Sequence, residues 1–573
     1  MRIRGLRGLP LLLLLAACSA AGGDDAATGD ESDLTEGSAE AGAVLALVND
    51  RSVTAENMLS EAQVKLDVGK AIIAHRDGAD GLPATSDDDL FDSIRELDTV
   101  PGVGPATVAR LLDYAKRKGL LSGATEVIFS PAPAEASHLV RIAKEIDQAK
   151  TSVDIAIYSY SDAKITDALA RAVARGVKVR FVYNDAPTDA RLSAALLASS
   201  TSGKLEASGV NVRFINKIMH HKFMIVDGPR DEIARAKTAH LVTGSANWTS
   251  SAARTYDENT VIFQNQEELV LRFQREFDNM WAHSRDVVAK DLPYELATTQ
   301  ISDSAIPDAP DTNVLFTSYN FTVKNTTFTT TGTNTVADGL VAGINSATHS
   351  IHIASGHMRS REVAEALIAK KKANPGLDVR VYLDDQEYIT KDTHDAQVVK
   401  VQTCLAAAGD SAAKKRDCLD NDFLFGYQIG SEGIDVRYKF YAYRWDASYA
   451  PQMHHKFMAV DGTTLYSGSY NLSDNAEHGT FENMMVLTGA THAALIKAFE
   501  GNFESIWKTG RDEGRLAALN ARIDQGGAFP IVFDPIALTG DEIAVLKQKI
   551  RTACPAVDSD AFRSAATSHR TCQ

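Results

Sequence analysis

Cysteine, positive charge and long apolar segments are all scarce in this chain. Its 573 residues contain five cysteines and no Cys-x2-Cys pair, which disfavours a structural zinc site. The 59 basic residues are outnumbered by 75 acidic ones, and the formal net charge is −16. Such a surface repels polyanions on average, although local basic patches remain compatible with it. The hydrophobic fraction of 44% and the charged fraction of 23% are typical of a globular protein, and they exclude a disordered chain or a multi-span membrane protein.

Residues 1–18 have the pattern of a bacterial export signal. Three arginines, Arg2, Arg4 and Arg7, precede an apolar run at residues 11–15 that is too short to span a membrane. The Leu-Ala-Ala-Cys sequence that ends at Cys18 resembles a lipobox, in which the cysteine carries lipid and becomes the mature N-terminus. The alternative is plain secretion with cleavage nearby. We therefore expect an exported protein that is anchored to a membrane of the cell envelope through lipidated Cys18.

The four other cysteines suggest disulfides, because an exported chain folds in an oxidising compartment. Local spacing favours Cys404 with Cys418 and Cys554 with Cys572. Four cysteines allow three connectivities, however, and the sequence does not choose among them.

Two segments precede the main body of the chain. Residues 19–42 are rich in Gly, Ala, Ser, Asp and Glu, which predicts a flexible acidic linker. Residues 43–122 have a helical pattern, and the segment from Leu97 to Ala106 with its Gly-Val-Gly turn resembles a helix-hairpin-helix unit. That resemblance implies a turn that binds nucleic-acid phosphate, whereas a glycine-rich turn that only packs two helices is the alternative.

From residue 126 to residue 512 the chain contains the same pattern twice. Each copy, residues 126–290 and 310–512, alternates helical segments with short β-branched strands, which predicts α/β halves. The matching segments are Ser152–Tyr158 and Ser350–Ala354, Val177–Tyr183 and Leu377–Leu383, Met219–Asp227 and Met453–Asp461, and Gly244–Asn247 and Gly468–Asn471. We therefore expect an α/β pseudo-dimer of two fused halves with a small helical N-terminal region, acting as a monomer with an internal pseudo-two-fold axis. Residues 513–573 are expected to form a tail, to which no chemistry is assigned.

The third matching segment contains His-x-Lys-x4-Asp in both copies, and Gly-Ser-x-Asn follows it. If the motif lies on a strand, the histidine and the lysine share one face, whereas His221 and His455 point the other way as packing or supporting residues. Asp227 and Asp461 would lie at the far end of the strand, where a structural role is favoured over direct catalysis. The candidate catalytic residues are His220, Lys222, Asp227, Asn247, Glu258, His454, Lys456, Asp461, Asn471 and Glu482, supported by Ser245 and Ser469.

These paired motifs resemble the phospholipase D superfamily across residues 126–510. The resemblance implies a two-step mechanism without a metal or another cofactor, in which one histidine attacks phosphorus and the other protonates the leaving alcohol. By resemblance we assign His220 as the nucleophile and His454 as the acid. Glu258 and Glu482 would fix the histidine tautomers, and the lysines and asparagines would bind the phosphate oxygens.

The same superfamily includes lipases, synthases and nucleases, so the reaction type is better defined than the substrate. We expect a phosphoric diester hydrolase that acts on phospholipid head groups, because a lipid anchor would hold the site near a bilayer. The alternatives are a metal-independent endonuclease, favoured by the helix-hairpin-helix-like segment, and a phosphatidyltransferase of the cardiolipin synthase type. An inactive scaffold is disfavoured because both motifs are complete.

The two copies differ in the segment after the motif. Residues 228–243 of the first copy correspond to only residues 462–467 of the second. The longer segment, which contains Arg230, is expected to be a surface loop between strands.

Overall fold

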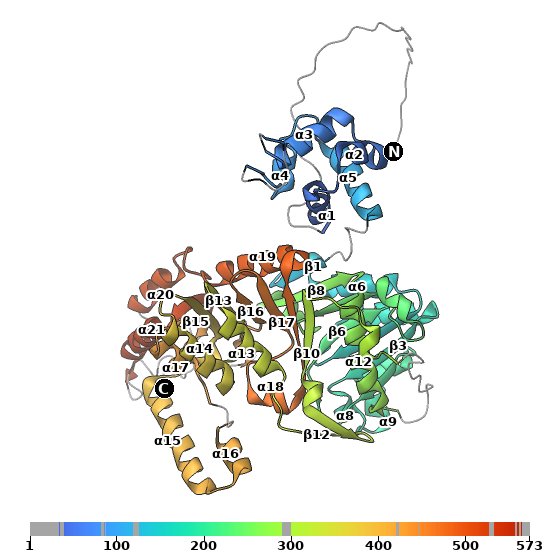
Figure 1. Ribbon diagram of the computed structural model, residues 1–573. Helices are drawn as coiled ribbons and strands as arrows, with labels where there is room; N and C mark the ends of the chain where they lie inside the picture. Colours follow the sequence, from blue (N-terminus) through green and yellow to red (C-terminus); the bar gives the residue numbers. More distant parts are fainter. Residues whose placement is uncertain are drawn as a thin grey trace, which may run out of the picture. The chain divides into compact units, whose positions relative to one another are not determined.

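The computed structural model describes residues 34, 39–78, 80–81, 85, 87–118, 125–288, 300–419, 423–445, 447–525, 532–555, 559–560 and 563. These residues fall into two compact units, one made of residues 44–114 and the other of residues from 115 onward (Figure 1). The predicted export signal with Cys18, nearly all of the predicted linker, and Cys572 lie outside the described residues. No helix in the described ranges is both long and apolar enough to cross a bilayer.

The N-terminal region is helical, and its first helix begins within the segment that the sequence assigned to the linker. Gly102 lies in the turn before the last helix with a φ of 87°, a conformation that favours glycine. A Cβ at Gly102 would lie 2.6 Å from Cγ2 of Val68, so this turn packs closely against a neighbouring helix. A role in phosphate binding stays a prediction. The helices are α1 (Ala39–Asn49), α2 (Ala55–Ala62), α3 (Leu66–Arg76), α4 (Ile94–Leu97) and α5 (Pro105–Arg117).

The larger unit contains two eight-stranded mixed sheets with the same strand order, which confirms the predicted α/β fold of two similar halves (Figure 1). Across the first sheet the strands are β1 (Thr125–Ser130), β8 (Glu258–Gln264), β7 (His240–Gly244), β6 (Lys222–Val226), β2 (Ser152–Ile157), β3 (Lys178–Tyr183), β4 (Asn211–Phe214) and β9 (Arg285–Asp286). Strands β2, β3 and β4 are parallel to one another, whereas the other pairings are antiparallel.

The second sheet repeats this arrangement strand for strand. Its order is β10 (Thr312–Phe316), β19 (Asn483–Thr488), β17 (Thr464–Gly468), β16 (Lys456–Val460), β13 (Ser350–Ser355), β14 (Asp378–Asp384), β15 (Asp435–Ala442) and β20 (Val532–Thr539). Strand β20 belongs to the segment that the sequence assigned to a separate tail. It pairs with β15, so this segment completes the second sheet.

Helices cover the two sheets, and short strands add local pairings. The first half contains α6 (His138–Gln148), α7 (Ala163–Ala174), α8 (Ala186–Asp189), α9 (Ala194–Leu197), α10 (Thr201–Ala207), α11 (Ser250–Arg254) and α12 (Glu267–Ala282). The second half contains α13 (Val336–Ser346), α14 (Arg361–Ala373), α15 (Lys391–Ala408), α16 (Ala412–Leu419), α17 (Gly426–Ser431), α18 (Asp474–His478), α19 (Gly489–Ile506), α20 (Arg515–Asp524) and α21 (Gly540–Ala553). The short strands are β5 (Ile218–Met219), β11 (Phe321–Lys324), β12 (Thr327–Thr330) and β18 (Thr480–Phe481).

A shared hydrophobic core joins the two halves. Phe223, Phe273 and Phe277 of the first half and Phe457 and Phe499 of the second belong to one cluster of buried side chains. Burial of each such side chain stabilises the fold by about 1.5–3 kcal/mol. The interface is therefore the interior of one folded body, and it holds the two motif strands at a fixed separation.

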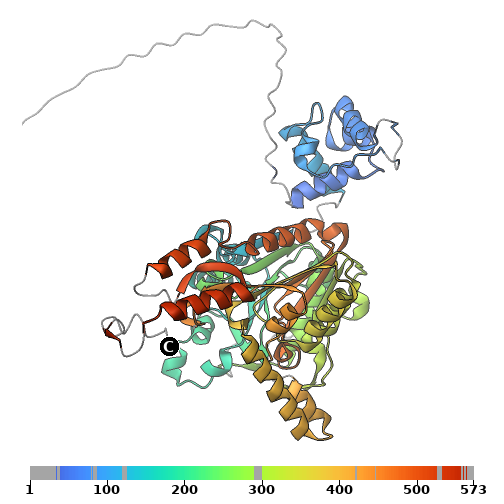
Figure 2. The same cartoon turned by 90° about the vertical axis from the view of Figure 1, so that its left-hand side faces the viewer.

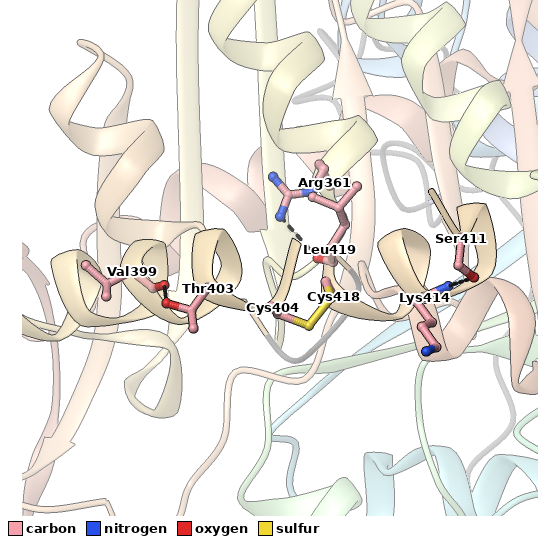
Figure 3. Close-up of a disulfide and its surroundings, with 8 residues drawn as sticks. All are labelled: Arg361, Val399, Thr403, Cys404, Ser411, Lys414, Cys418 and Leu419. Carbon is pink, nitrogen blue, oxygen red and sulfur yellow. Dashed lines mark hydrogen bonds between the residues drawn. A yellow bond between two sulfur atoms is a disulfide. The ribbon is translucent and has the colours of Figure 1, made fainter. Parts of the chain in front are cut away.

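Helices α15 and α16 form a hairpin that projects from the body in both views (Figures 1 and 2). A disulfide between Cys404 and Cys418 joins the two helices, which confirms the first predicted pairing. Arg361 of α14 donates a hydrogen bond to the carbonyl oxygen of Leu419 at 3.1 Å and ties the end of α16 to the body (Figure 3). The second predicted pairing involves Cys572, which lies outside the described residues.

The longer segment after β6 is not simply the surface loop that the sequence predicts. Arg230 is buried and donates hydrogen bonds to both carboxylate oxygens of Asp154, which also binds Arg180. Ala236 and Ala239 are fully buried as well. Arg230 is therefore one of two cations that balance the buried charge of Asp154 in the first sheet.

Candidate active site

The two motif histidines are each positioned by backbone contacts with the opposite half. The strand pattern places both histidines on strands, but both lie just before β6 and β16 and outside them. The amide of His220 donates to the carbonyl of Phe481, and the amide of His454 donates to the carbonyl of Asp257, both at 3.0 Å. Two backbone hydrogen bonds thus join the halves, and they place each histidine beside the glutamic acid of the other half.

The predicted carboxylates bind the histidines in this crossed manner. Nδ1 of His220 lies 2.7 Å from Oε1 of Glu482, and Nδ1 of His454 lies 2.6 Å from Oε1 of Glu258. Both carboxylates are buried. The carboxylate of Glu258 is hydrogen-bonded to Nδ1 of His454 and fixes its tautomer, whereas Glu482 contacts Nδ1 of His220 as an ion pair. In both rings Nε2 is the nitrogen left to react.

The serines of the Gly-Ser-x-Asn segments hold the acidic strands in place. Oγ of Ser469 donates to Oε2 of Glu482 at 2.6 Å and accepts a hydrogen bond from the amide of Asn483 at 3.0 Å. Oγ of Ser245 accepts from the amide of Asn259 at 2.9 Å. Both serines thus lie next to the acids and not at the histidine rings, and the supporting role that the sequence suggests for them stays a prediction.

Lys222 and Lys456 are almost fully buried beside the histidines. Nζ of each donates to the carbonyl oxygen of the histidine two residues before it, at 2.6 Å for Lys222 and 2.8 Å for Lys456. An ammonium has three donors, so each lysine keeps hydrogen-bonding capacity for a phosphate oxygen. The two cations and the two histidines form a site suited to one phosphodiester.

Burial sets the protonation of this site. It lowers the pKa of Lys222 to about 7 and that of Lys456 to about 8, and it raises the pKa of Glu258 to about 7 and that of Glu482 to about 6. The two lysines thus lose their protons, and the two glutamic acids keep theirs, nearer to neutral pH than exposed groups would. Such pKa shifts are typical of catalytic groups.

The two histidines respond to charges from both halves. Burial, followed by the charges of Lys222 and Lys456, lowers the pKa of His220 well below its usual value. Burial, Lys456, Lys222 and then His357 lower the pKa of His454 in the same way. Each ring is affected by the lysine of the opposite half, so the two half-sites face one another as the motif pattern predicts.

Asn247 and Asn471 lie in the loops that follow β7 and β17. Oδ1 of each is buried and has no hydrogen-bond partner within the described ranges. A buried amide oxygen without a donor is unusual, and a phosphate oxygen, which only accepts hydrogen bonds, cannot satisfy it. The oxygen-binding role that the sequence suggests for these residues stays a prediction.

Asp227 and Asp461 lie away from the histidines, at the opposite ends of β6 and β16. Both have a φ of 53°, and each carboxylate accepts hydrogen bonds from the backbone amides that precede a central strand. For Asp461 the donors are the amides of Thr348, His349 and Ser350 at 2.7–2.8 Å. Although they were included among the candidate catalytic residues, the two aspartates close turns and do not contact the histidines.

Two asparagines that the sequence analysis did not select also cross between the halves. Nδ2 of Asn259 lies 3.1 Å from Nδ1 of His455, and Nδ2 of Asn483 lies 3.0 Å from Nδ1 of His221. His221 and His455 are fully buried, in the supporting positions predicted for them. A repeat signal could have identified the asparagines, because each directly follows a site acid in both copies.

Among the described residues, one group of side chains has the spacing for a metal ion. It consists of His75, Asp89 and Glu96 in the helical unit. The prediction that catalysis needs no metal depends on the two lysines as the source of positive charge, and it stays a prediction.

Comparisons with known proteins agree with this geometry. The family model described as "Cardiolipin synthase, PLD-like domain" matches residues 142–281 and 340–507, which is more than half of the chain. The mitochondrial cardiolipin hydrolase of Danio rerio is 33% identical over 147 residues, 25% of this chain and 57% of that protein. A phospholipase D of Rickettsia conorii is 33% identical over 126 residues, 22% of this chain and 56% of that protein. The chain thus spans little more than half the length of these curated relatives.

Two solved structures are also similar. Nuc of Salmonella typhimurium, a phospholipase D family member, is 30% identical, with 29% of this chain and 97% of that chain covered and a TM-score of 0.24. Phosphatidylserine synthase of Haemophilus influenzae is 14% identical, with 66% and 85% covered and a TM-score of 0.42. From the paired motifs and the match of the family model over both halves, the chain belongs to the phospholipase D superfamily, whose enzymes act on phosphodiester bonds.

Proposed function

We propose that the protein is a phospholipase D-type phosphodiesterase, which hydrolyses the head-group phosphodiester bond of membrane phospholipids through a phosphohistidine. The observation that carries this proposal is the crossed arrangement of His220 with Glu482 and His454 with Glu258, between two buried lysines. It supplies a nucleophile, an acid and an oxyanion site around one phosphorus atom.

In the first step, Nε2 of His220 attacks phosphorus, and the bond from phosphorus to the head-group oxygen breaks. Glu482 stabilises the positive charge that develops on the ring, because it holds the Nδ1 proton. His454 gives its Nε2 proton to the leaving oxygen. The negative charge of the bound substrate opposes the effect of the lysines on the pKa of His454 and so favours its protonated form.

In the second step, His454 takes a proton from water, and the resulting hydroxide attacks phosphorus. The bond from phosphorus to Nε2 of His220 breaks, which releases phosphatidic acid and restores both histidines. Lys222 and Lys456 bind the non-bridging oxygens in both steps. An alcohol in place of water would give transfer in place of hydrolysis.

The choice of phospholipid has separate support. The matched relatives are a mitochondrial cardiolipin hydrolase and a phospholipase D, and the acidic net charge of −16 disfavours a polyanion. A lipid on Cys18 would hold the site at a bilayer of the cell envelope, where such substrates are concentrated.

The test compares two substrates under one condition. The full chain with Cys18→Ala is incubated in chelator with phospholipid vesicles and, separately, with supercoiled plasmid. Release of head group without nicking is the expected result, and His220→Ala is the matched inactive control. Nicking without head-group release would establish the endonuclease, and exchange of the head group for an added alcohol with little hydrolysis would establish the transferase.

A further inference from the structure

The two half-sites differ at one pair of equivalent positions directly after the central strands. Tyr158 follows β2, and its ring lies 4.4 Å from that of His220 between centroids. Gly356 is the equivalent residue after β13. A Cβ at Gly356 would lie 4.0 Å from Cδ2 of His454, so no side chain covers this second ring from the equivalent position. The side chain of His454 is 18% exposed and that of His220 is 9% exposed, although the ring of Tyr256 lies 6.0 Å from that of His454 between centroids.

The residue after Gly356 is a third histidine. His357 corresponds to Ser159 of the first half, and its Nδ1 lies 3.0 Å from Oε1 of Glu387. Glu387 is fully buried and also accepts hydrogen bonds from Arg359 at 2.7 and 2.9 Å and from the amide of Met358 at 3.1 Å. The first half has Pro187 at the position of Glu387, so this arrangement breaks the internal symmetry.

The backbone places His357 beside the second half-site. The amide of Gly356 donates to the carbonyl of His455 at 3.3 Å, and the amide of Arg359 donates to the carbonyl of Leu472 at 2.7 Å. The segment thus lies between the motif histidine and the loop that contains Asn471. His357 is close enough to His454 that its protonated form would lower the pKa of His454.

The contact with Glu387 determines which nitrogen of His357 can accept a hydrogen bond from a ligand. With Nδ1 held by the carboxylate, Nε2 is the ring nitrogen left as a hydrogen-bond acceptor, and it has no partner among the residues that the structure describes. His357 is partly exposed, at 23% of its side chain. A hydroxyl group can donate to this nitrogen, whereas a trimethylammonium group cannot, and the nearby Arg359 and Lys456 disfavour a cation.

From this geometry we infer that His357 determines specificity for the alcohol that leaves and for the one that enters, by accepting a hydrogen bond from an uncharged hydroxyl-bearing head group such as glycerol. The inference rests on the proposed function, because the alcohol departs on the side of the acid, His454. Tyr158 packs against the ring of His220 on the opposite side. Polyol head groups are then preferred over alkyl or choline head groups of similar size.

The experiment uses the full chain with phosphatidylglycerol and phosphatidylpropanol of the same acyl chains in mixed micelles. Their head groups differ only in hydroxyl groups. We expect the wild type to favour phosphatidylglycerol in kcat/KM, and we expect His357→Ala to reduce that ratio by about tenfold, the effect of one lost hydrogen bond to a buried group. His357→Gln should recover part of the ratio, because its amide oxygen also accepts a hydrogen bond.

Two further measurements separate specificity from stability. Hydrolysis of bis(p-nitrophenyl) phosphate, which has no hydroxyl group, should change by no more than about twofold in His357→Ala. Ser159→Ala, at the equivalent position of the first half, should keep the wild-type ratio. If His357→Ala lowers both lipid rates equally and keeps the ratio, the residue is structural and the inference is wrong. A wild type that hydrolyses both lipids without preference also overturns it, whereas one that hydrolyses neither lipid overturns the proposed function with it.

Discussion

Each active-site histidine is paired with the glutamic acid of the opposite half, and this crossed pairing predicts which acid variant behaves like which histidine variant. If each acid served the histidine of its own half, the expected results would be exchanged. Glu482→Gln, a change in the second half, should have the kinetics of a His220 variant. Glu258→Gln, a change in the first half, should have those of a His454 variant. Each substitution removes a buried carboxylate 2.6–2.7 Å from Nδ1, a distance typical of a charge-assisted hydrogen bond. Loss of the equivalent carboxylate from a catalytic triad lowers kcat by about 10⁴-fold, and we expect about 10³–10⁴-fold here.

The two variants are distinguished with a p-nitrophenyl phosphodiester, whose leaving group needs little protonation. Glu258→Gln and His454→Ala should release a stoichiometric burst of p-nitrophenol and then stall, because activation of water is lost. Acid quench and peptide mapping should locate the adduct on the peptide with His220. Glu482→Gln and His220→Ala should give no burst.

Glu145→Gln is the matched control for this experiment. Glu145 is also a buried carboxylate, 2.5 Å from Nδ1 of His240, but it lies outside the active site. Its loss should leave the burst intact. A burst in Glu482→Gln and none in Glu258→Gln, with His220 as the labelled residue, would show that each acid serves the histidine of its own half and would refute the crossed assignment.

Four other outcomes are expected. Activity on a charged diester should fall as the pH rises through about 7 to 8, because Lys222 and Lys456 are active when protonated and have pKa values of about 7 and 8; a kcat/KM that stays level to pH 10 would contradict this. Asp461→Ala should lower the free energy of unfolding by about 2–4 kcal/mol, since several hydrogen bonds are lost and alanine disfavours a positive φ; urea denaturation measures this, and Asp461→Asn should cost less. Cys18→Ala should release the protein from membranes and leave turnover of soluble diesters unchanged, as fractionation would show. EDTA should leave hydrolysis unchanged, and a loss restored by added zinc or calcium would refute this.

The repeated motifs made much of the fold and of the site predictable. Two histidines, two lysines and two acids recur in the same order in both copies, and the structure brings these six residues together. Periodicity could not show which acid serves which histidine, because both copies contain the same spacing. That choice depends on the backbone contacts of Asp257 and Phe481 with the opposite half, which are long-range and leave no local pattern.

Features that are present in only one copy could not be predicted from the repeat. His357 and Glu387 are separated by helix α14 and strand β14, and neither has a counterpart in the first half that would draw attention to it. Arg230 lies in a segment that is longer in the first copy, which predicts a surface loop, yet its side chain inserts beside Asp154. Strand β20 was not predicted because it pairs with β15, which lies almost a hundred residues earlier in the chain.

The contacts between each histidine and the acid of the opposite half also constrain how such a sequence can evolve. In a dimer of identical halves, one gene change alters both half-sites, so the two rings must stay equivalent. Fusion removes that restriction, and the copies have diverged at two pairs of equivalent positions, Tyr158 and Gly356, and Pro187 and Glu387. Yet each histidine still depends on a carboxylate encoded in the other copy. Neither copy can therefore be lost or replaced alone, and substitutions near one acid are expected to be compensated in the opposite repeat.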